Sequence, residues 1–293
     1  MSQAVWHEGL LSELTAFSVV ARRRLAGGAP GEQRSSRLGG GLEFADHRPY
    51  VPGDDIRALD WNAYRAHRKL FIRQFEEQQD LSISLLLDCS ASIGFGDGAK
   101  FFAARRLALA LAYLGLSGLD SVSVHGLFAD RVATLPPLRG RGRYAAVLAF
   151  LDALTPNGPT ELARALSRVA ERSRRRSLAV LITDGYDPRG IERAVDVLVG
   201  ARFEPILIEL EDAGDLKPDA SGEVVLVDVE TREERGFLLT PGELAALREK
   251  AEARRQERAR RMRARGVRYA RVSVRESVPG ILRTLESAGV LQR

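Results

Sequence analysis

Apolar runs that end abruptly in polar residues dominate the hydrophobic pattern of this chain. Residues 81–87 are mostly apolar and stop at Asp88, and residues 177–183 form a second run that stops at Asp184. Such runs are typical of strands that are buried on both faces of a parallel sheet. Because ligands bind at the carboxyl ends of the strands in an open parallel sheet, we expect both carboxylates at a functional edge.

Helical and extended patterns alternate along the rest of this region. The expected helices cover residues 99–116, 144–154, 161–172, 190–201, an Arg-rich stretch from 241, and 278–288. The expected strands include residues 205–209 and 269–274, and residues 121–128 and 131–135 form a hairpin across Ala129 and Asp130. Residues 212–234 are expected to be a polar insertion. This order predicts an α/β fold with a doubly wound, mostly parallel sheet and one antiparallel edge strand.

An amino-terminal extension, residues 1–79, precedes the predicted α/β domain of residues 80–293. A spacing of three to four predicts one apolar helix face, formed by Trp6, Leu10, Leu14, Phe17 and Ala21. Residues 26–42 are rich in Gly and Ser and predict a mobile loop. Residues 69–76 alternate as a strand. The extension is therefore expected to combine helical and β structure.

Residues 43–61 concentrate charged and large aromatic side chains, namely Asp46, Arg48, Tyr50, Asp54, Asp55, Arg57, Asp60 and Trp61. Pro52 and Gly53 predict a turn, and Asp54 or Asp55 is expected to cap a short helical turn through Trp61. One interpretation is a buried Arg–Asp network that pins the extension to the domain, and we favour it on the residues alone. The alternative is a surface that docks a partner.

Polar side chains after the two apolar runs have the chemistry of a divalent metal site. Asp88, Ser90 and Ser92 are spaced two apart after the first run, Asp184 follows the second, and Thr160 lies in a loop before an expected helix. Carboxylates and hydroxyls are hard oxygen donors, which suit Mg²⁺ or Mn²⁺ better than zinc or copper. A serine after a strand is also a common helix N-cap, so the first run alone does not predict a metal.

This pattern of Asp-x-Ser-x-Ser, then Thr, then Asp resembles the metal-ion-dependent adhesion site of von Willebrand factor A domains. The resemblance implies that Ser90, Ser92 and Thr160 coordinate the metal. It also implies that Asp88 and Asp184 act directly or through water. The remaining coordination position is then open to an acidic side chain of a partner protein.

A second, longer motif covers the charged extension and comprises Gly39, Glu43, Phe44, Arg48, Tyr50, Gly53, Asp54, Asp55, Arg57, Asp60 and Trp61. It resembles the segment before the metal-site strand in MoxR-associated bacterial von Willebrand A-like proteins, a family long catalogued as a domain of unknown function. The resemblance covers nearly the whole chain; one departure is Ile93, where many relatives carry Met. It implies an adaptor that works with a MoxR-type AAA+ ATPase to assemble or remodel an unidentified client protein.

Composition limits the other partners. The 293 residues contain 45% hydrophobic residues and a net charge of +5, carried by 40 arginines and four lysines. The arginine runs lack interleaved aromatic residues, and acidic residues interrupt the run at 254–265, so we expect solvated helix faces and no binding of nucleic acid.

The apolar run at 107–119 is too short to span a bilayer, and Glu8 and Glu13 argue against a signal peptide. With Cys89 as the one cysteine, a soluble, cytoplasmic protein is expected.

Two classes of function are compatible with these residues. The first is a binding module rather than an enzyme, because the motif contains no His, Lys or Tyr as a general base. The alternative is a metal-dependent phosphohydrolase similar to haloacid-dehalogenase-like enzymes, with Asp88 as nucleophile and Thr183 binding phosphate. Those enzymes need a second carboxylate two residues after the first, and Ser90 stands there. We favour the binding module.

Overall fold

The structure is a computed structural model that describes residues 18–19, 42–52, 56, 59–77, 81–173, 177–212 and 222–292. Within these ranges it describes the backbone, but not the side chains, of residues 18–19, 42–48, 66–67, 73–77, 278 and 292. The described residues belong to two compact units. The sheet unit contains residues 18–19 and those from Leu81 onward, and the amino-terminal unit contains those from 42 to 77.

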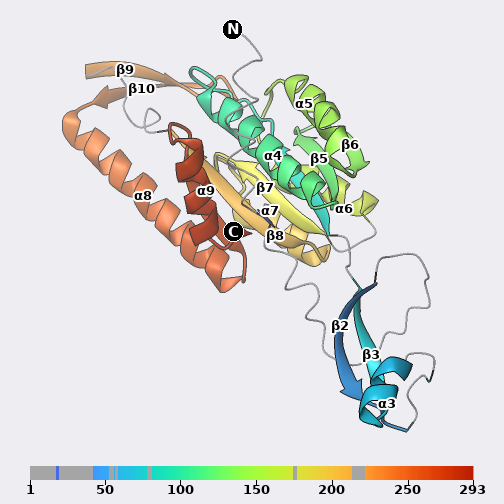
Figure 1. The fold of residues 1–293 in the computed structure, drawn as a ribbon. Helices are drawn as coiled ribbons and strands as arrows, with labels where there is room; N and C mark the ends of the chain where they lie inside the picture. Colours follow the sequence, from blue (N-terminus) through green and yellow to red (C-terminus); the bar gives the residue numbers. More distant parts are fainter. Residues whose placement is uncertain are drawn as a thin grey trace. The chain divides into compact units, whose positions relative to one another are not determined.

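A six-stranded sheet organises the sheet unit, in the order β11-β8-β7-β4-β5-β6 (Figure 1). Its strands are β4 (Ser82–Asp88), β5 (Ser121–Leu127), β6 (Val132–Leu138), β7 (Leu178–Thr183), β8 (Glu204–Glu211) and β11 (Arg268–Ser273). Neighbouring strands are parallel except for β5 and β6, which pair antiparallel at one edge. The central strands β4 and β7 are buried along almost their whole length, as their apolar runs predict.

Helices cover both faces of this sheet, and they confirm the predicted doubly wound α/β class. They are α4 (Ala99–Ser117), α5 (Tyr144–Asp152), α6 (Leu162–Arg172) and α7 (Ile191–Gly200). Helix α4 approaches one face so closely that a Cβ on Gly115 would lie 2.7 Å from Val122 and 2.9 Å from Ile83. Helices α6 and α7 pack on the opposite face, in a core with Leu86 and Leu181. The helix bounds agree with the sequence predictions to within two residues.

The carboxyl-terminal part adds a hairpin and two helices, namely β9 (Gly222–Val227), β10 (Glu234–Leu239), α8 (Pro241–Ala264) and α9 (Val278–Ser287). Thr240 and Glu243 form a capping box that begins α8. The interpretation of residues 212–234 as a polar insertion was wrong from Gly222 onward. Six cross-strand pairs form there because the apolar run 224–227 meets Phe237 and its neighbours.

The first described strand also corrects a prediction. β1 (Ser18–Val19) pairs antiparallel with β12 (Leu291–Gln292), so residues 18–19 are extended and not part of a helix. Pairing with the end of the chain outweighs the helical spacing at these two positions. The other residues of the expected amino-terminal helix, and residues 26–41 of the expected loop, lie outside the described residues.

The amino-terminal unit contains an antiparallel pair, β2 (Leu42–Pro49) and β3 (Phe71–Glu77), and the short helix α3 (Trp61–His67). The β3 strand was predicted and β2 was not. Asp60 caps α3, because its carboxylate accepts the backbone N–H groups of Asn62 and Ala63 at 2.9 and 3.0 Å. The helix therefore begins at Trp61. Of the predicted helical turn that ends at Trp61, Ile56 lies in a 3₁₀ turn, whereas Leu59 and Asp60 are not helical.

Candidate functional site

The loop after β4 folds back on itself and gathers its polar side chains. The backbone N–H of Ser90 donates to Asp88 Oδ1 at 2.9 Å. The hydroxyls of Ser90 and Ser92 are 3.0 Å apart, within hydrogen-bond distance. All three residues are buried. The two-residue spacing thus places one carboxylate and two hydroxyls together, at the carboxyl end of the central strand.

Asp184 joins this group from the neighbouring strand. It follows β7, which pairs in parallel with β4, and its Oδ1 lies 3.5 Å from the Ser92 hydroxyl and 3.2 Å from the Tyr186 backbone N–H. The preceding residue, Thr183, donates its hydroxyl to Asp88 Oδ2 at 2.7 Å. The structure therefore brings four of the five predicted site residues together at the ends of adjacent strands.

Thr160 lies in a loop that is fastened to the Asp88–Ser92 loop. The N–H of Asn157 donates to the carbonyl of Cys89 at 2.9 Å, and the N–H of Ala91 donates to the carbonyl of Gly158 at 2.8 Å. These bonds hold the two loops side by side, and Thr160 itself is buried. Its hydroxyl donates to a residue that the sequence did not single out, Glu230, at 2.5 Å.

Lys100 is a second residue of the site that the sequence prediction missed. Its ammonium lies 3.3 Å from Asp184 Oδ2, and the two side chains are only 4% and 0% exposed. It also lies 5.4 Å from the centroid of the Tyr186 ring. The one feature of the sequence that could have pointed to Lys100 is that lysine is rare in this chain, with four lysines against 40 arginines. It precedes its partner by 84 positions, so no local pattern identifies the pair.

Burial and like charge make the two carboxylates reluctant to ionise. Burial, and next the charge of Asp184, raise the pKa of Asp88 to about 7. Burial also raises the pKa of Asp184, while Lys100 opposes that rise. With both carboxylates ionised, the group of Asp88, Asp184 and Lys100 carries a formal charge of −1. A cation would offset this charge.

The donor set suits a hard cation. No three His, Cys, Asp or Glu side chains gather into a metal-binding group within the described ranges, so a metal at this place would depend on hydroxyl oxygens. Two carboxylates and the hydroxyls of Ser90 and Ser92 are such oxygens, and Thr160 offers a third hydroxyl from the adjacent loop. These residues fit Mg²⁺ or Mn²⁺ and do not fit a soft metal.

A cavity of about 700 Å³ opens beside the group and has walls from several elements. Ser92, Lys100 and Asp184 line it on the sheet side, Glu230 lines it from the β9–β10 hairpin, and arginines of α8, including Arg254, line another wall. A protein side chain can therefore approach the site from this cavity.

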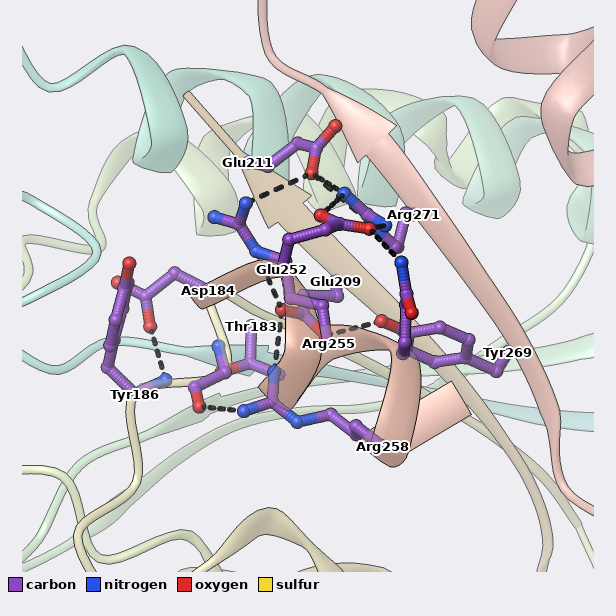
Figure 2. Close-up of polar contacts among 12 residues, drawn as sticks. Thr183, Asp184, Tyr186, Glu209, Glu211, Glu252, Arg255, Arg258, Tyr269 and Arg271 are labelled. Carbon is purple, nitrogen blue, oxygen red and sulfur yellow. Dashed lines mark hydrogen bonds and ion pairs between the residues drawn. The ribbon is translucent and has the colours of Figure 1, made fainter. Parts of the chain in front are cut away.

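A buried ion-pair network attaches α8 to the loop that carries Asp184 (Figure 2). Glu209 lies 2.6 Å from Arg258 and 3.9 Å from Arg255, and it accepts the Tyr269 hydroxyl at 2.6 Å. Arg258 also donates to the carbonyl of Gly185 at 3.0 Å. Gly185 has φ of +78°, and a Cβ there would collide with the Arg258 guanidinium.

The network corrects the expectation of a solvated helix face at two positions of this arginine run, whereas Arg254, Arg260, Arg261, Arg263 and Arg265 are exposed as expected. Arg255 and Arg258 are only 15% and 18% exposed, and they neutralise a buried glutamate. Residues 174–176, another arginine run, and residues 22–24 lie outside the described residues.

The charged segment of the extension lies in the amino-terminal unit. Tyr50 is half-buried, and Trp61 is 62% exposed and packs edge-on against Tyr64 at 6.3 Å between ring centroids. Asp60 is used as the helix cap. Asp54, Asp55 and Arg57 lie outside the described residues, as do the side chains of Asp46 and Arg48. The buried network and the docking surface both stay predictions.

The geometry does not favour the phosphohydrolase alternative. Asp88 has no exposed surface, and each of its carboxylate oxygens accepts a hydrogen bond, from the Ser90 backbone and from Thr183. A nucleophile must reach its substrate, and the Thr183 hydroxyl, which was proposed to bind phosphate, donates its hydrogen bond to the Asp88 carboxylate instead.

No helix in the described part of the chain is both long and apolar enough to cross a membrane.

Known proteins similar to this chain include an uncharacterised protein of Mycobacterium tuberculosis and its counterpart in Mycobacterium bovis. Each is 30% identical over 79% of this chain and 74% of the relative. Among solved structures, the conserved hypothetical protein BatB from Bacteroides thetaiotaomicron is similar at 17% identity, over 71% of this chain and 98% of BatB, with a TM-score of 0.39. The manganese-loaded TRAP protein of Plasmodium vivax is similar at 23% identity, over 44% and 57% of the two chains, with a TM-score of 0.34.

These solved structures are too distantly related to this chain to indicate a shared function. The family comparison is stronger. The family described as "Protein of unknown function DUF58" matches residues 46–261, which is most of the chain. The chain therefore belongs to that family.

Proposed function

We propose that this protein is a metal-dependent, protein-binding adaptor. Its metal site comprises Asp88, Ser90, Ser92, Thr160 and Asp184, and Mg²⁺ or Mn²⁺ bound there captures an acidic side chain of a partner. The observation that carries this proposal is the convergence of two buried carboxylates and two hydroxyls at the ends of β4 and β7, beside a cavity. When bound, the metal supplies an electrophilic centre for a carboxylate.

Lys100 makes such a site more attractive to a carboxylate than the five motif residues would. Two carboxylates alone neutralise a divalent cation, and the incoming acidic group then meets little surplus charge. With Lys100 at 3.3 Å from Asp184, the same group has a formal charge of +1 once a divalent cation is present. Because the group is buried, this surplus charge is weakly screened. A partner's carboxylate is favoured as the neutralising ligand.

The proposed partners follow from the resemblance to MoxR-associated proteins. A MoxR-type AAA+ ATPase is the partner, and an unidentified client protein is assembled or remodelled. The charged segment of the extension supplies a second contact through Arg48 and Arg57. In this proposal the protein breaks no covalent bond in its partner or client, binds no nucleic acid and works in the cytoplasm.

The test is the affinity of the full chain for a MoxR-type ATPase from the same organism, measured with Mg²⁺ and with chelator. We expect the affinity to fall about tenfold or more with chelator and in Asp184→Ala, and to fall in Arg57→Ala with metal saturating. Asp196→Ala is the matched control, because Asp196 is an exposed residue of α7 in a surface ion pair with Arg265. Equal affinity with and without the ion would show that the metal site is not the docking point.

A further inference from the structure

The β9–β10 hairpin ends in a rigid turn that presents one carboxylate. Asp228 Oδ1 accepts the backbone N–H groups of Glu230 and Thr231, both at 2.8 Å. The N–H of Arg232, which has φ of +62°, donates to the Asp228 carbonyl at 2.9 Å. The bonds from the Thr231 and Glu230 amides hold the pKa of the Asp228 carboxyl below its usual range. Hydrogen bonds within the turn thus hold the backbone of Glu230 independently of the contacts of its side chain.

The carboxylate of Glu230 clasps Thr160 with both oxygens. One oxygen accepts the Thr160 hydroxyl at 2.5 Å and the other accepts the Thr160 backbone N–H at 2.9 Å. Thr160 is buried, and the two residues are 70 positions apart. Glu230 also lines the cavity that contains Ser92 and Asp184. A carboxylate of the chain itself therefore binds one of the proposed metal-site residues, beside the cavity from which a partner's carboxylate would approach.

The rest of the hairpin is weakly embedded. Its strands form a two-stranded sheet of their own, and large apolar side chains lie open to solvent, with Val225 62% and Leu238 59% exposed. Isolated hairpins of two strands are marginally stable in water. An element of this kind opens at low free-energy cost, so the hairpin can withdraw while the sheet stays intact.

We propose that Glu230 is an internal occupant of the acidic-ligand position, and that a partner's carboxylate binds by displacing it together with the hairpin. This inference rests on the proposed function and adds competition between the two carboxylates. A hydroxyl has one proton and two lone pairs, so Thr160 can coordinate a metal while it donates to Glu230. With a divalent cation, Lys100 and both aspartates present, the Glu230 carboxylate brings the formal charge to zero.

Competition within one chain sets a high threshold for the partner. The tethered Glu230 carboxylate acts at an effective concentration in the millimolar range. An acidic segment of a partner must therefore bind the site more tightly than Glu230 does, or make a second contact elsewhere on the protein. The hairpin thus restricts the site to partners that make a second contact. Removal of Glu230 is expected to strengthen the binding of a simple acidic ligand.

The probe is a fluorescently labelled peptide of consecutive glutamates, titrated with the full chain in Mg²⁺. We expect Glu230→Ala to bind the peptide about tenfold or more tightly than the wild type. Glu223→Ala is the matched control, because Glu223 is an exposed residue of the same hairpin and the substitution makes the same change of charge. Equal affinity in the wild type and Glu230→Ala, including no binding by either, would overturn the inference.

A second measurement separates this inference from the proposed function. Hydrogen exchange of the Thr160 amide, followed without metal, should be faster in Glu230→Ala than in Glu223→Ala; unchanged exchange would show that the clasp does not exist in solution. Mn²⁺ binding is measured on the wild type and on Asp184→Ala. If the peptide gain is missing while Mn²⁺ binds to wild type and not to Asp184→Ala, the internal occupant is wrong and the metal site stands. If Asp184→Ala binds Mn²⁺ as tightly as the wild type does, both the proposed metal site and the internal occupant are wrong.

Discussion

Replacing Lys100 with Met should destabilise the metal-free protein. Lys100 and Asp184 are 3.3 Å apart with side chains 4% and 0% exposed, and removal of one member of a buried ion pair costs about 3–5 kcal/mol. Burial already raises the pKa of Asp184, so this carboxyl can take up a proton instead of staying charged and unpaired. We therefore expect a loss at the lower end, about 3 kcal/mol.

The same substitution should strengthen metal binding. Without the ammonium, the formal charge of the two carboxylates and residue 100 changes from −1 to −2. Unit charges about 5 Å apart interact by roughly 3 kcal/mol at an effective dielectric constant of about 20. Reorganisation and protonation of Asp184 reduce this gain, and we expect Mg²⁺ to bind about tenfold more tightly, or about 1.4 kcal/mol.

Urea unfolding without metal and calorimetric titration with Mg²⁺ measure the two effects. Lys250→Met is the matched control, because Lys250 is exposed on α8 and the chemical change is the same. The control should alter neither quantity by more than about 0.5 kcal/mol. Unchanged or weaker Mg²⁺ binding in Lys100→Met would refute the reasoning, since the ammonium would then not oppose a cation.

Three further variants test buried polar groups of the sheet unit. Burial lowers the pKa of His125 to about 4, so the unfolded chain binds more protons at this residue below about pH 6.5, and the contribution of His125 to stability should fall by roughly 2 kcal/mol between pH 7 and pH 5. The raised pKa of Asp88 acts in the opposite direction in both proteins, so the measurement is the difference in unfolding free energy between wild type and His125→Gln, which urea unfolding should show to change by that amount over this pH range. Thr183→Val deprives the buried Asp88 carboxylate of a donor and should cost about 1–3 kcal/mol in the same assay, where a change under about 0.5 kcal/mol would contradict the argument. Glu209→Gln leaves two half-buried arginines undercompensated and should lower stability by about 2 kcal/mol, whereas an unchanged melting temperature would show that the network contributes little.

Local sequence pattern was sufficient for most of the sheet unit. An apolar run bounded by polar residues predicts a buried strand directly, and parallel strands place their ends at one edge, so the proximity of Asp88 and Asp184 followed from the pattern. The β9–β10 hairpin was missed because Asp228, Glu230 and neighbouring charges made residues 212–234 look like a polar connector. Its apolar residues are largely exposed, so burial leaves no periodic signal in the sequence.

The missed site residues depend on long-range packing. Lys100 meets Asp184 across 84 positions, and Glu230 meets Thr160 across 70. Neither residue has a neighbour in the sequence that hints at its partner, because the contact arises only when helix α4 and the hairpin reach the sheet edge. The Arg258 contact with Gly185 is of the same kind. The residues of the proposed metal site could be predicted from their motif, whereas Lys100 and Glu230, which change the charge around that site, could not.

Mn²⁺ binding, followed by electron paramagnetic resonance, tests the central claim most directly. Wild-type protein should bind one Mn²⁺ per chain in competition with Mg²⁺, and Ser90→Ala with Asp184→Ala should abolish that binding while the circular dichroism spectrum stays unchanged. Ser167→Ala is the matched control, because this hydroxyl of α6 donates to a backbone carbonyl within its own helix. The same Mn²⁺ stoichiometry and affinity in the double variant as in wild type would contradict the account.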